Sequence, residues 1–281
     1  MTTTTFFPGL WTGIYHTLPL HQALARLRAE GWRAFEVSTE HLVALETAPD
    51  RDFLVDQAAG VIAALALAVP QAHPLLKADV AAADAAARGE DIRRLQVHFA
   101  LAARLGVKQV VVHPGGGRGI TSRAEWQRVR AANVESFRRL GDEAAGLGLT
   151  IGIENMMRRG FASPFEMQDL LAAIAHPAVK FTFDSSHANA AGFNLADYVV
   201  EMGGSLVALH LSDNDGSGDQ HRVPGSGTID WAALMAALRR VGYAGYVNLE
   251  IPGERHPDPD LQRLKLEHAR RVAEWLTGSM S

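Results

Sequence analysis

The sequence contains no cysteine, and this absence excludes several kinds of chemistry. Disulfide bonds, a thiol nucleophile and a cysteine-based zinc site are ruled out, because each of them needs a cysteine sulfur. Any metal ion held by side chains must therefore be bound by imidazole and carboxylate groups. The chain has ample supplies of both, with 12 histidines and 31 acidic residues.

Long apolar runs and an excess of one charge are also missing. The longest uncharged apolar run, residues 58–69, is well short of the roughly 20 residues that span a bilayer. The first residues lack the basic and apolar regions of a secretory signal peptide. Lysine plus arginine (27) nearly balance aspartate plus glutamate (31), so the formal net charge is −4. We therefore expect a cytoplasmic protein that uses no membrane and for which nucleic acid is an unfavoured partner.

The 281 residues alternate between short apolar segments and helical segments. Eight segments are apolar at nearly every position, as parallel strands buried on both faces are. They cover residues 10–15, 34–37, 67–72, 109–112, 150–153, 180–183, 206–209 and 246–249. The α/β pattern has no linker, which predicts a single (β/α)₈ TIM barrel over residues 1–281. The rival, a doubly wound open sheet, lacks its phosphate-binding glycine pattern after the first strand.

Several helices have recognisable ends. Ser122-Arg-Ala-Glu125 and Ser163-Pro-Phe-Glu166 each have the spacing of a capping box at a helix start. Residues 257–277 have the pattern of a closing amphipathic helix, and residues 212–228 form the one long polar loop.

Polar side chains gather where the predicted strands end. The active site of a (β/α)₈ barrel is built at the carboxyl ends of its strands, so residues there are candidate functional groups. Glu36 lies inside the second strand and is not counted among them. The third to eighth strands and their loops supply His73, His113, Glu154, Asp184, His187, His210, Asp219, His221 and Glu250.

This set predicts a metal site. A single histidine at a strand end is more often structural, but Glu154 and Glu250 directly follow apolar strands, where an unpaired carboxylate is costly. Glu154, Asp184, His210 and Glu250 together offer mostly oxygen with one nitrogen, a set that suits Mn²⁺, Mg²⁺ or Co²⁺.

The other rim residues offer further ligands. His73, His113, His187 and His221 would supply nitrogen for additional ions, most naturally Zn²⁺. For an anionic substrate the candidate cations are Arg222, Lys108 and the pair at 158–159. A solvated-surface role is the favoured interpretation for each of them, and Arg222 is the best placed to meet a substrate.

The order of several short motifs resembles that of the xylose isomerase-like barrels. This superfamily includes ketose 3-epimerases, hydroxypyruvate and inosose enzymes, and endonuclease IV. The resemblance extends over nearly the whole chain and rests on six motifs, which are strong only in combination. They are Leu105-Gly-Val-Lys-Gln-Val-Val-Val-His-Pro-Gly115, Ile153-Glu-Asn155, Asp184-Ser-Ser-His187, His210-Leu-Ser-Asp213, Pro224-Gly-Ser-Gly227 and Leu249-Glu-Ile-Pro252.

The resemblance implies two alternative sites. In the sugar epimerases one metal is held by residues that match Glu154, Asp184, His210 and Glu250, and the residue that matches His187 contacts the substrate. In endonuclease IV three zinc ions are held by residues that match this set together with His73, His113, His187, Asp219 and His221. The segment after Glu154 and the segment after His73 both differ from the endonuclease pattern. Arg222 is only adjacent to the position where the epimerases often carry arginine.

We therefore interpret the chain first as a metal-dependent isomerase or epimerase of a small sugar or keto-polyol. Glu154 and Glu250 would remove and return a proton through a cis-enediolate. Asp184 and His210 would complete the metal shell, while His187 and Arg222 would orient substrate oxygens. The alternatives are a multi-zinc phosphodiesterase that acts on abasic DNA and a non-catalytic sugar-binding or partner-subunit role. The sequence leaves open which sugar is used, whether the reaction is isomerisation, epimerisation or elimination, and the oligomeric state, a homo-oligomer included.

Overall fold

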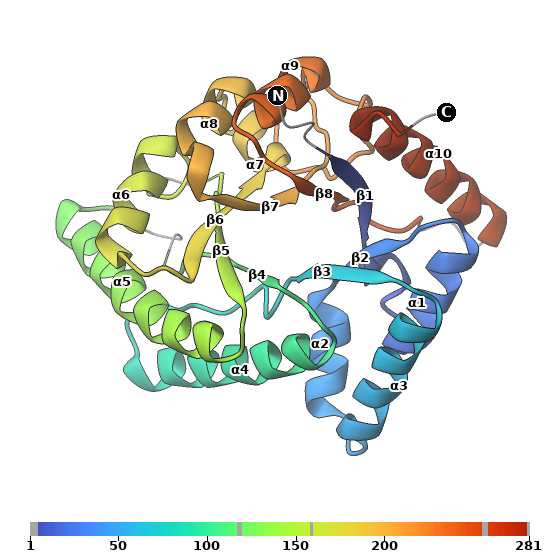
Figure 1. The fold of residues 1–281 in the computed structure, drawn as a ribbon. Helices are drawn as coiled ribbons and strands as arrows, with labels where there is room; N and C mark the ends of the chain where they lie inside the picture. The colour runs from blue at the N-terminus through green and yellow to red at the C-terminus, as the bar shows by residue number, and fades with distance from the viewer. Residues whose placement is uncertain (1–4, 117–119, 158–159, 255–257, 280–281) are drawn as a thin grey trace.

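The computed structural model, which describes residues 5–116, 120–157, 160–254 and 258–279, has eight parallel strands wrapped into a barrel (Figure 1). In space the strands follow the order β7-β6-β5-β4-β3-β2-β1-β8. The ring closes between β7 and β8, where Leu211 bridges Leu249 and its amide donates to the carbonyl of Asn248 at 2.9 Å. The strands are β1 (Phe6–Trp11), β2 (Ala34–Val37), β3 (Ala68–Ala72), β4 (Gln109–Val112), β5 (Thr150–Glu154), β6 (Val179–Asp184), β7 (Leu206–His210) and β8 (Gly245–Leu249). The predicted (β/α)₈ barrel is confirmed.

Helices surround this barrel on its outside (Figure 1). Apolar side chains such as Leu24, Phe35 and Phe99 are fully buried, so the core lies between the strands and the helices. The capping box at α6 is confirmed, because Ser163 Oγ accepts from the Glu166 amide at 3.2 Å and the Glu166 carboxylate accepts from the Ser163 amide. The α-helices are α1 (Leu20–Ala29), α2 (Thr39–Thr47), α3 (Arg51–Ala64), α4 (Ala85–Arg104), α5 (Arg123–Gly146), α6 (Pro164–Ile174), α7 (Ser185–Ala190), α8 (Leu195–Met202), α9 (Trp231–Arg240) and α10 (Pro259–Thr277).

The first strand differs from its prediction. It starts at Phe6 rather than at residue 10, because residues Phe6 to Leu10 pair in parallel with Gly245 to Leu249 of β8. The last four residues of the predicted strand 10–15 instead form a 3₁₀ turn, Thr12–Tyr15. An apolar run this short does not distinguish a strand from a helical turn. The predicted start of the last helix, residue 257, lies outside the described residues.

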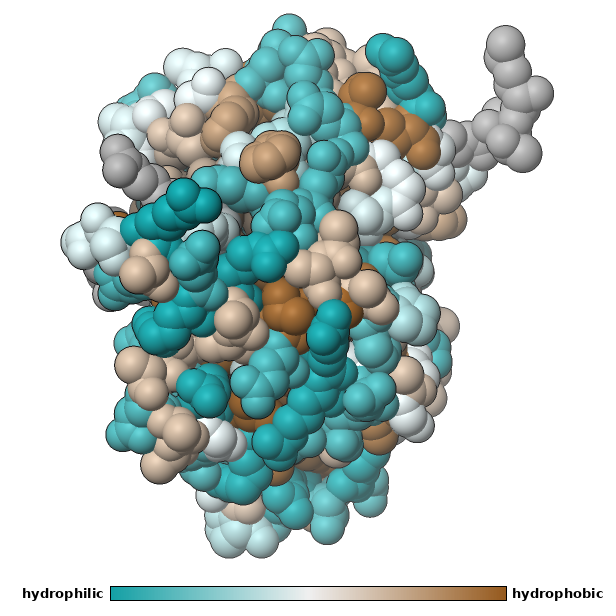
Figure 2. All heavy atoms as spheres, turned by 90° about the vertical axis from the view of Figure 1, so that its left-hand side faces the viewer, coloured by the Kyte–Doolittle hydropathy of each residue, from teal (hydrophilic) through white to brown (hydrophobic). Residues whose placement is uncertain are grey.

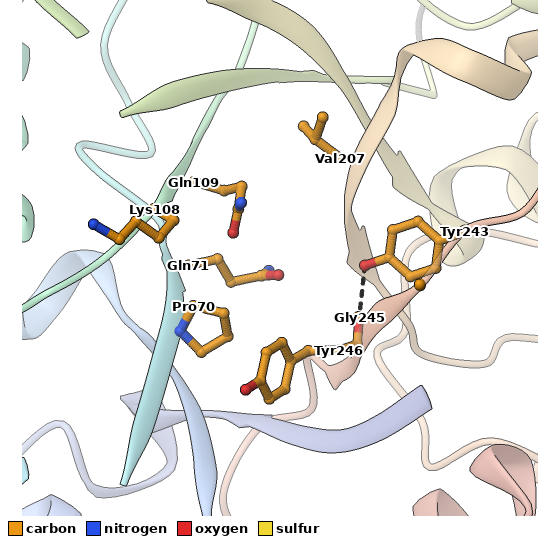
Figure 3. A pocket seen from close by; sticks show the side chains of 9 residues that line it. Pro70, Gln71, Lys108, Gln109, Val207, Tyr243, Gly245 and Tyr246 are labelled. Carbon is orange, nitrogen blue, oxygen red and sulfur yellow. Dashed lines mark hydrogen bonds between the residues drawn. The ribbon is translucent and has the colours of Figure 1, made fainter. Parts of the chain in front are cut away.

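The two ends of the barrel differ in character. At the amino ends of the strands lies a cavity of about 210 Å³, lined by residues that include Gln71, Lys108 and Tyr246 (Figure 3). Tyr243 Oη donates to the Tyr246 carbonyl at 3.0 Å beside it. In (β/α)₈ barrels the end formed by the amino ends of the strands usually contributes to stability, whereas the active site lies at the carboxyl ends. On the face seen in Figure 2, hydrophilic residues are interspersed with small apolar areas.

Candidate metal centre

Four predicted ligands meet at the carboxyl ends of the strands. Glu154 ends β5, Asp184 ends β6, His210 ends β7 and Glu250 follows β8. One ligand atom from each of these residues lies within 4.8 Å of all the others. Two further groups, His73 with His210 and Glu250, and His73 with His113 and Glu154, meet the same distance limit.

Glu154 lies at the centre of this arrangement and is 1% exposed. Its Oε1 lies 3.3 Å from His210 Nδ1 and 3.4 Å from His187 Nδ1. Its Oε2 lies 3.4 Å from His73 Nε2 and 3.2 Å from His113 Nε2. A carboxylate so deeply buried needs compensating positive charge or hydrogen-bond donors, and the four imidazoles are placed to supply them.

Several of these buried polar atoms have no hydrogen-bond partner within the described part of the chain. Nearly all buried polar groups in proteins are satisfied, so a cluster of unsatisfied atoms needs an explanation. The atoms all have lone pairs that a cation accepts, and the donor set of carboxylate and imidazole fits a hard or borderline divalent ion. The cluster thus fits a metal ion. The atoms concerned are His73 Nε2, Glu154 Oε2, Asp184 Oδ2 and His210 Nδ1.

Main-chain carbonyls orient three of the histidines. Nδ1 of His73 lies 3.0 Å from the Pro74 carbonyl, and Nδ1 of His187 lies 2.8 Å from the Asn155 carbonyl. Nδ1 of His221 lies 2.9 Å from the Glu250 carbonyl. Because a carbonyl only accepts, Nδ1 carries a proton in each case. Nε2 of His73 then faces Glu154, whereas Nε2 of His187 and of His221 faces Asp219.

Glu36 also belongs to the site, although it is not among the residues predicted from the sequence. Its side chain is fully buried inside β2, and its Oε1 lies 2.8 Å from His210 Nε2. Its Oε2 accepts a hydrogen bond from Asn248 Nδ2. The signal was available in the sequence, because a carboxylate in the apolar segment 34–37 has the same burial cost that marked Glu154 and Glu250.

The loop between β7 and α9 contributes Asp219 and His221. Asp219 Oδ2 lies 3.0 Å from His221 Nε2 and 3.4 Å from His187 Nε2, so the loop reaches the cluster. His221 has a φ of 47°, in the left-handed region that non-glycine residues rarely adopt. Backbone strain of this kind is often found at functional sites.

The cationic side chains suggested as partners of an anionic substrate occupy other positions in the structure. Arg222 donates to Asp215 Oδ2 at 2.9 Å and to the Ser226 carbonyl at 3.3 Å, so its guanidinium is bound within its own loop. Lys108 is exposed, in line with the solvated-surface role favoured for it, and does not reach the rim. Lys108 precedes β4 and therefore lines the cavity at the opposite end of the barrel (Figure 3). The pair at 158–159 lies outside the described residues.

Burial and nearby opposite charges act against each other on the pKa values of the cluster. Burial alone raises the pKa of Glu154, yet His210 and His113 outweigh it and hold that pKa well below its usual range. Burial raises the pKa of Asp184 to about 7, against the opposing charge of His187. Burial lowers the pKa of His187, but Asp184 and Asp219 outweigh it and raise that pKa to about 10. Protons on the imidazoles thus balance the buried carboxylates, and a bound cation would have to displace some of them.

Comparisons with known proteins agree with this architecture. A family model described as "Xylose isomerase-like TIM barrel" matches residues 24–276. The uncharacterized protein MJ1311 of Methanocaldococcus jannaschii is 30% identical over 176 residues, or 59% of this chain and 59% of that protein, so the match spans about three-fifths of that relative's length. An L-ribulose 3-epimerase of Methylomonas sp. (strain DH-1) is 25% identical over 264 residues, or 90% of this chain and 85% of that protein.

One solved structure has the same fold over nearly its full length. A D-tagatose 3-epimerase-like protein superposes with a TM-score of 0.80 at 20% identity, covering 98% of both chains. Separately, none of the helices in the described ranges is both long enough and apolar enough to cross a membrane.

Proposed function

The chain belongs to the xylose isomerase-like TIM barrel family, and from this premise we propose that it is a divalent-metal-dependent isomerase or epimerase of a small sugar or keto-polyol. Its homologues and structural neighbours include sugar epimerases and isomerases. The observation that carries the proposal is the convergence of four buried ligand atoms from four neighbouring strand ends, belonging to Glu154, Asp184, His210 and Glu250.

These four residues would hold the ion. Three carboxylates and one imidazole suit Mn²⁺, Mg²⁺ or Co²⁺ better than a soft metal. Such an ion supplies Lewis acidity, which polarises a carbonyl and acidifies the neighbouring C–H.

The two glutamates would move the proton. Glu154 comes from β5 and Glu250 follows β8, so their carboxylates reach the mouth of the barrel from different strands. One would remove the proton from the carbon next to the carbonyl, and the other would return it to the resulting cis-enediolate. Return to the opposite face of the same carbon gives epimerisation, and return to the former carbonyl carbon gives isomerisation.

Two further residues would orient the substrate. The imidazole of His187, held by the Asn155 carbonyl, lies beside Glu154 and Asp184, where it can meet a substrate hydroxyl. Arg222 would have to leave Asp215 to do the same, because the two side chains form an ion pair 2.9 Å long.

A second candidate function has a specific observation in its favour. His73 and His113 form a separate ligand group around Glu154, and Asp219 joins His187 to His221. These additional donors would suit further zinc ions, as in a multi-zinc phosphodiesterase that cleaves abasic DNA.

The metal content of the purified protein separates the two functions. Elemental analysis combined with native mass spectrometry should find one manganese-type ion per chain, and an abasic duplex should remain uncut. Three zinc ions per chain with salt-sensitive cleavage of that duplex would overturn the isomerase proposal in favour of the phosphodiesterase.

A further inference from the structure

Glu36 is placed where a carboxylate is costly. Every residue of β2 is buried, and the Glu36 side chain is 0% exposed. Its two oxygens contact His210 and Asn248, which come from β7 and β8. A buried ion pair often adds little stability compared with apolar side chains of the same volume. The location of this carboxylate therefore points to a role other than packing.

His210 differs from its neighbours in how it is oriented. His73, His187 and His221 each donate from Nδ1 to a main-chain carbonyl. His210 has the opposite arrangement, because its Nε2 contacts Glu36 at 2.8 Å. Its Nδ1 is left without a hydrogen-bond partner in the described chain, 3.3 Å from both Glu154 Oε1 and Glu250 Oε2.

Asn248, the second side chain that contacts Glu36, is itself fixed in position. Asn248 is 1% exposed and donates from Nδ2 to Glu36 Oε2. Gly9 of β1 leaves room for it, since a Cβ there would lie 3.3 Å from Asn248 Oδ1. Glu36 is thus fixed from β8 while it contacts the imidazole on β7.

We propose that Glu36 is a positioning residue that holds His210 with Nε2 protonated and Nδ1 directed at the metal-ligand cluster. This inference rests on the proposed metal-dependent function and deepens it. A carboxylate that accepts from the distal nitrogen of a ligating histidine selects its tautomer, fixes its ring and increases the basicity of the ligating nitrogen.

The test compares Mn²⁺ affinity in three variants, measured from the EPR signal of the free ion and without reference to activity. Glu36→Met removes the acceptor at similar volume. Glu36→Gln keeps an acceptor oxygen but removes the charge. Gln71→Met is the matched control, because Gln71 is equally buried in the neighbouring strand but donates to the Leu209 carbonyl rather than to an imidazole.

We expect Glu36→Met to weaken Mn²⁺ binding by about 10–100-fold, the usual effect of losing such a partner. Glu36→Gln should lie between Glu36→Met and the wild type, and Gln71→Met should match the wild type. In protein labelled with ¹⁵N-histidine and loaded with Cd²⁺, the wild-type His210 Nε2 proton should be observed downfield and should exchange slowly. That signal should disappear in Glu36→Met.

Other results would overturn the assignment. Equal affinity in Glu36→Met and the wild type, or equal losses in Glu36→Met and Gln71→Met, would show that Glu36 only fills space. A wild-type protein that binds no divalent ion would overturn the metal centre of the proposed function, and the role of Glu36 with it. Circular dichroism checks folding, and if Glu36→Met does not fold, the near-isosteric Glu36→Gln takes its place: wild-type affinity in that variant would contradict the assignment.

Discussion

Oε1 of Glu154 lies 3.3 Å from Nδ1 of His210, and the two atoms come from strand ends on either side of β6. The contact joins a carboxylate and an imidazole that are both almost completely buried. His210 Nδ1 has no hydrogen-bond partner in the part of the chain that the structure describes. The two atoms are thus placed to share a third partner, and a divalent cation meets the chemistry of both.

Replacing Glu154 by glutamine should abolish turnover. The substitution removes both a proposed metal ligand and the proposed base, so we expect a loss of kcat of at least about 10²–10⁴-fold, the usual contribution of a general base. Metal affinity should fall as well.

Glu201→Gln is the matched control for that variant, because Glu201 is an exposed glutamate on α8. It should leave turnover unchanged. Unaltered turnover in Glu154→Gln, with a normal circular dichroism spectrum, would contradict the assignment of Glu154 as the base.

The conformation of the loop that carries Asp219 and His221 should depend on the side chain of Asp213. The buried Asp213 carboxylate accepts from the Gly225 amide at 2.8 Å and from Trp231 Nε1 at 2.9 Å. In Asp213→Asn, the side-chain NH₂ group would face N–H groups that donate to the carboxylate in the wild type. These N–H groups would lose their acceptor, at a cost of about 1–3 kcal/mol. We expect a lower melting temperature, faster proteolysis within residues 212–228 and a higher KM. Ser217→Ala, at the exposed tip of the same loop, should change none of these.

Stability at low pH should depend on Glu46, which is not one of the proposed metal ligands. Glu46 on α2 receives two hydrogen bonds from Arg94 on α4, of 2.6 and 2.9 Å. These hydrogen bonds lower the pKa of Glu46 to about 2, against the opposing effect of burial. A carboxylate with a lowered pKa stabilises the folded state above its unfolded pKa, and the contribution is lost as pH falls through the folded value.

Glu46→Gln should therefore destabilise the protein by about 1.5–3 kcal/mol at neutral pH, the value of a hydrogen bond to a charged group. Denaturant unfolding should show the difference from the wild type shrinking from about pH 4.5 toward pH 2. A difference that stays constant over this range would contradict the assigned pKa. The exposed pair of Glu90 and Arg93 offers the control, since Glu90→Gln should cause no comparable loss.

Much of the fold was predictable because parallel strands buried on both faces leave a strong apolar pattern. The rim residues were predictable for a related reason, since chain order assigns every strand end to the same side of a barrel. That rule also places Lys108, which precedes β4, at the opposite end of the barrel.

Other features depend on contacts between distant parts of the chain. Glu36 and His210 are 174 positions apart in the sequence and are brought together by β2 and β7. An apolar pattern in the sequence does not show which imidazole nitrogen a distant carboxylate contacts. The position of the Arg222 guanidinium depends on Asp215, because the loop folds back on itself through the bridge between Asp213 and Arg222. The start of β1 was set by pairing with β8 rather than by its own apolar run.

Solvent-deuterium exchange tests the central claim most directly. The metal-loaded protein is incubated in D₂O with a panel of small ketoses and keto-polyols, and the products are examined by NMR and mass spectrometry. The account predicts that the true substrate gains deuterium at the carbon next to its carbonyl, and that Glu154→Gln or removal of the metal abolishes the exchange. Conversion of a sugar without any deuterium incorporation at that carbon, or undiminished exchange in the metal-free protein, would contradict it.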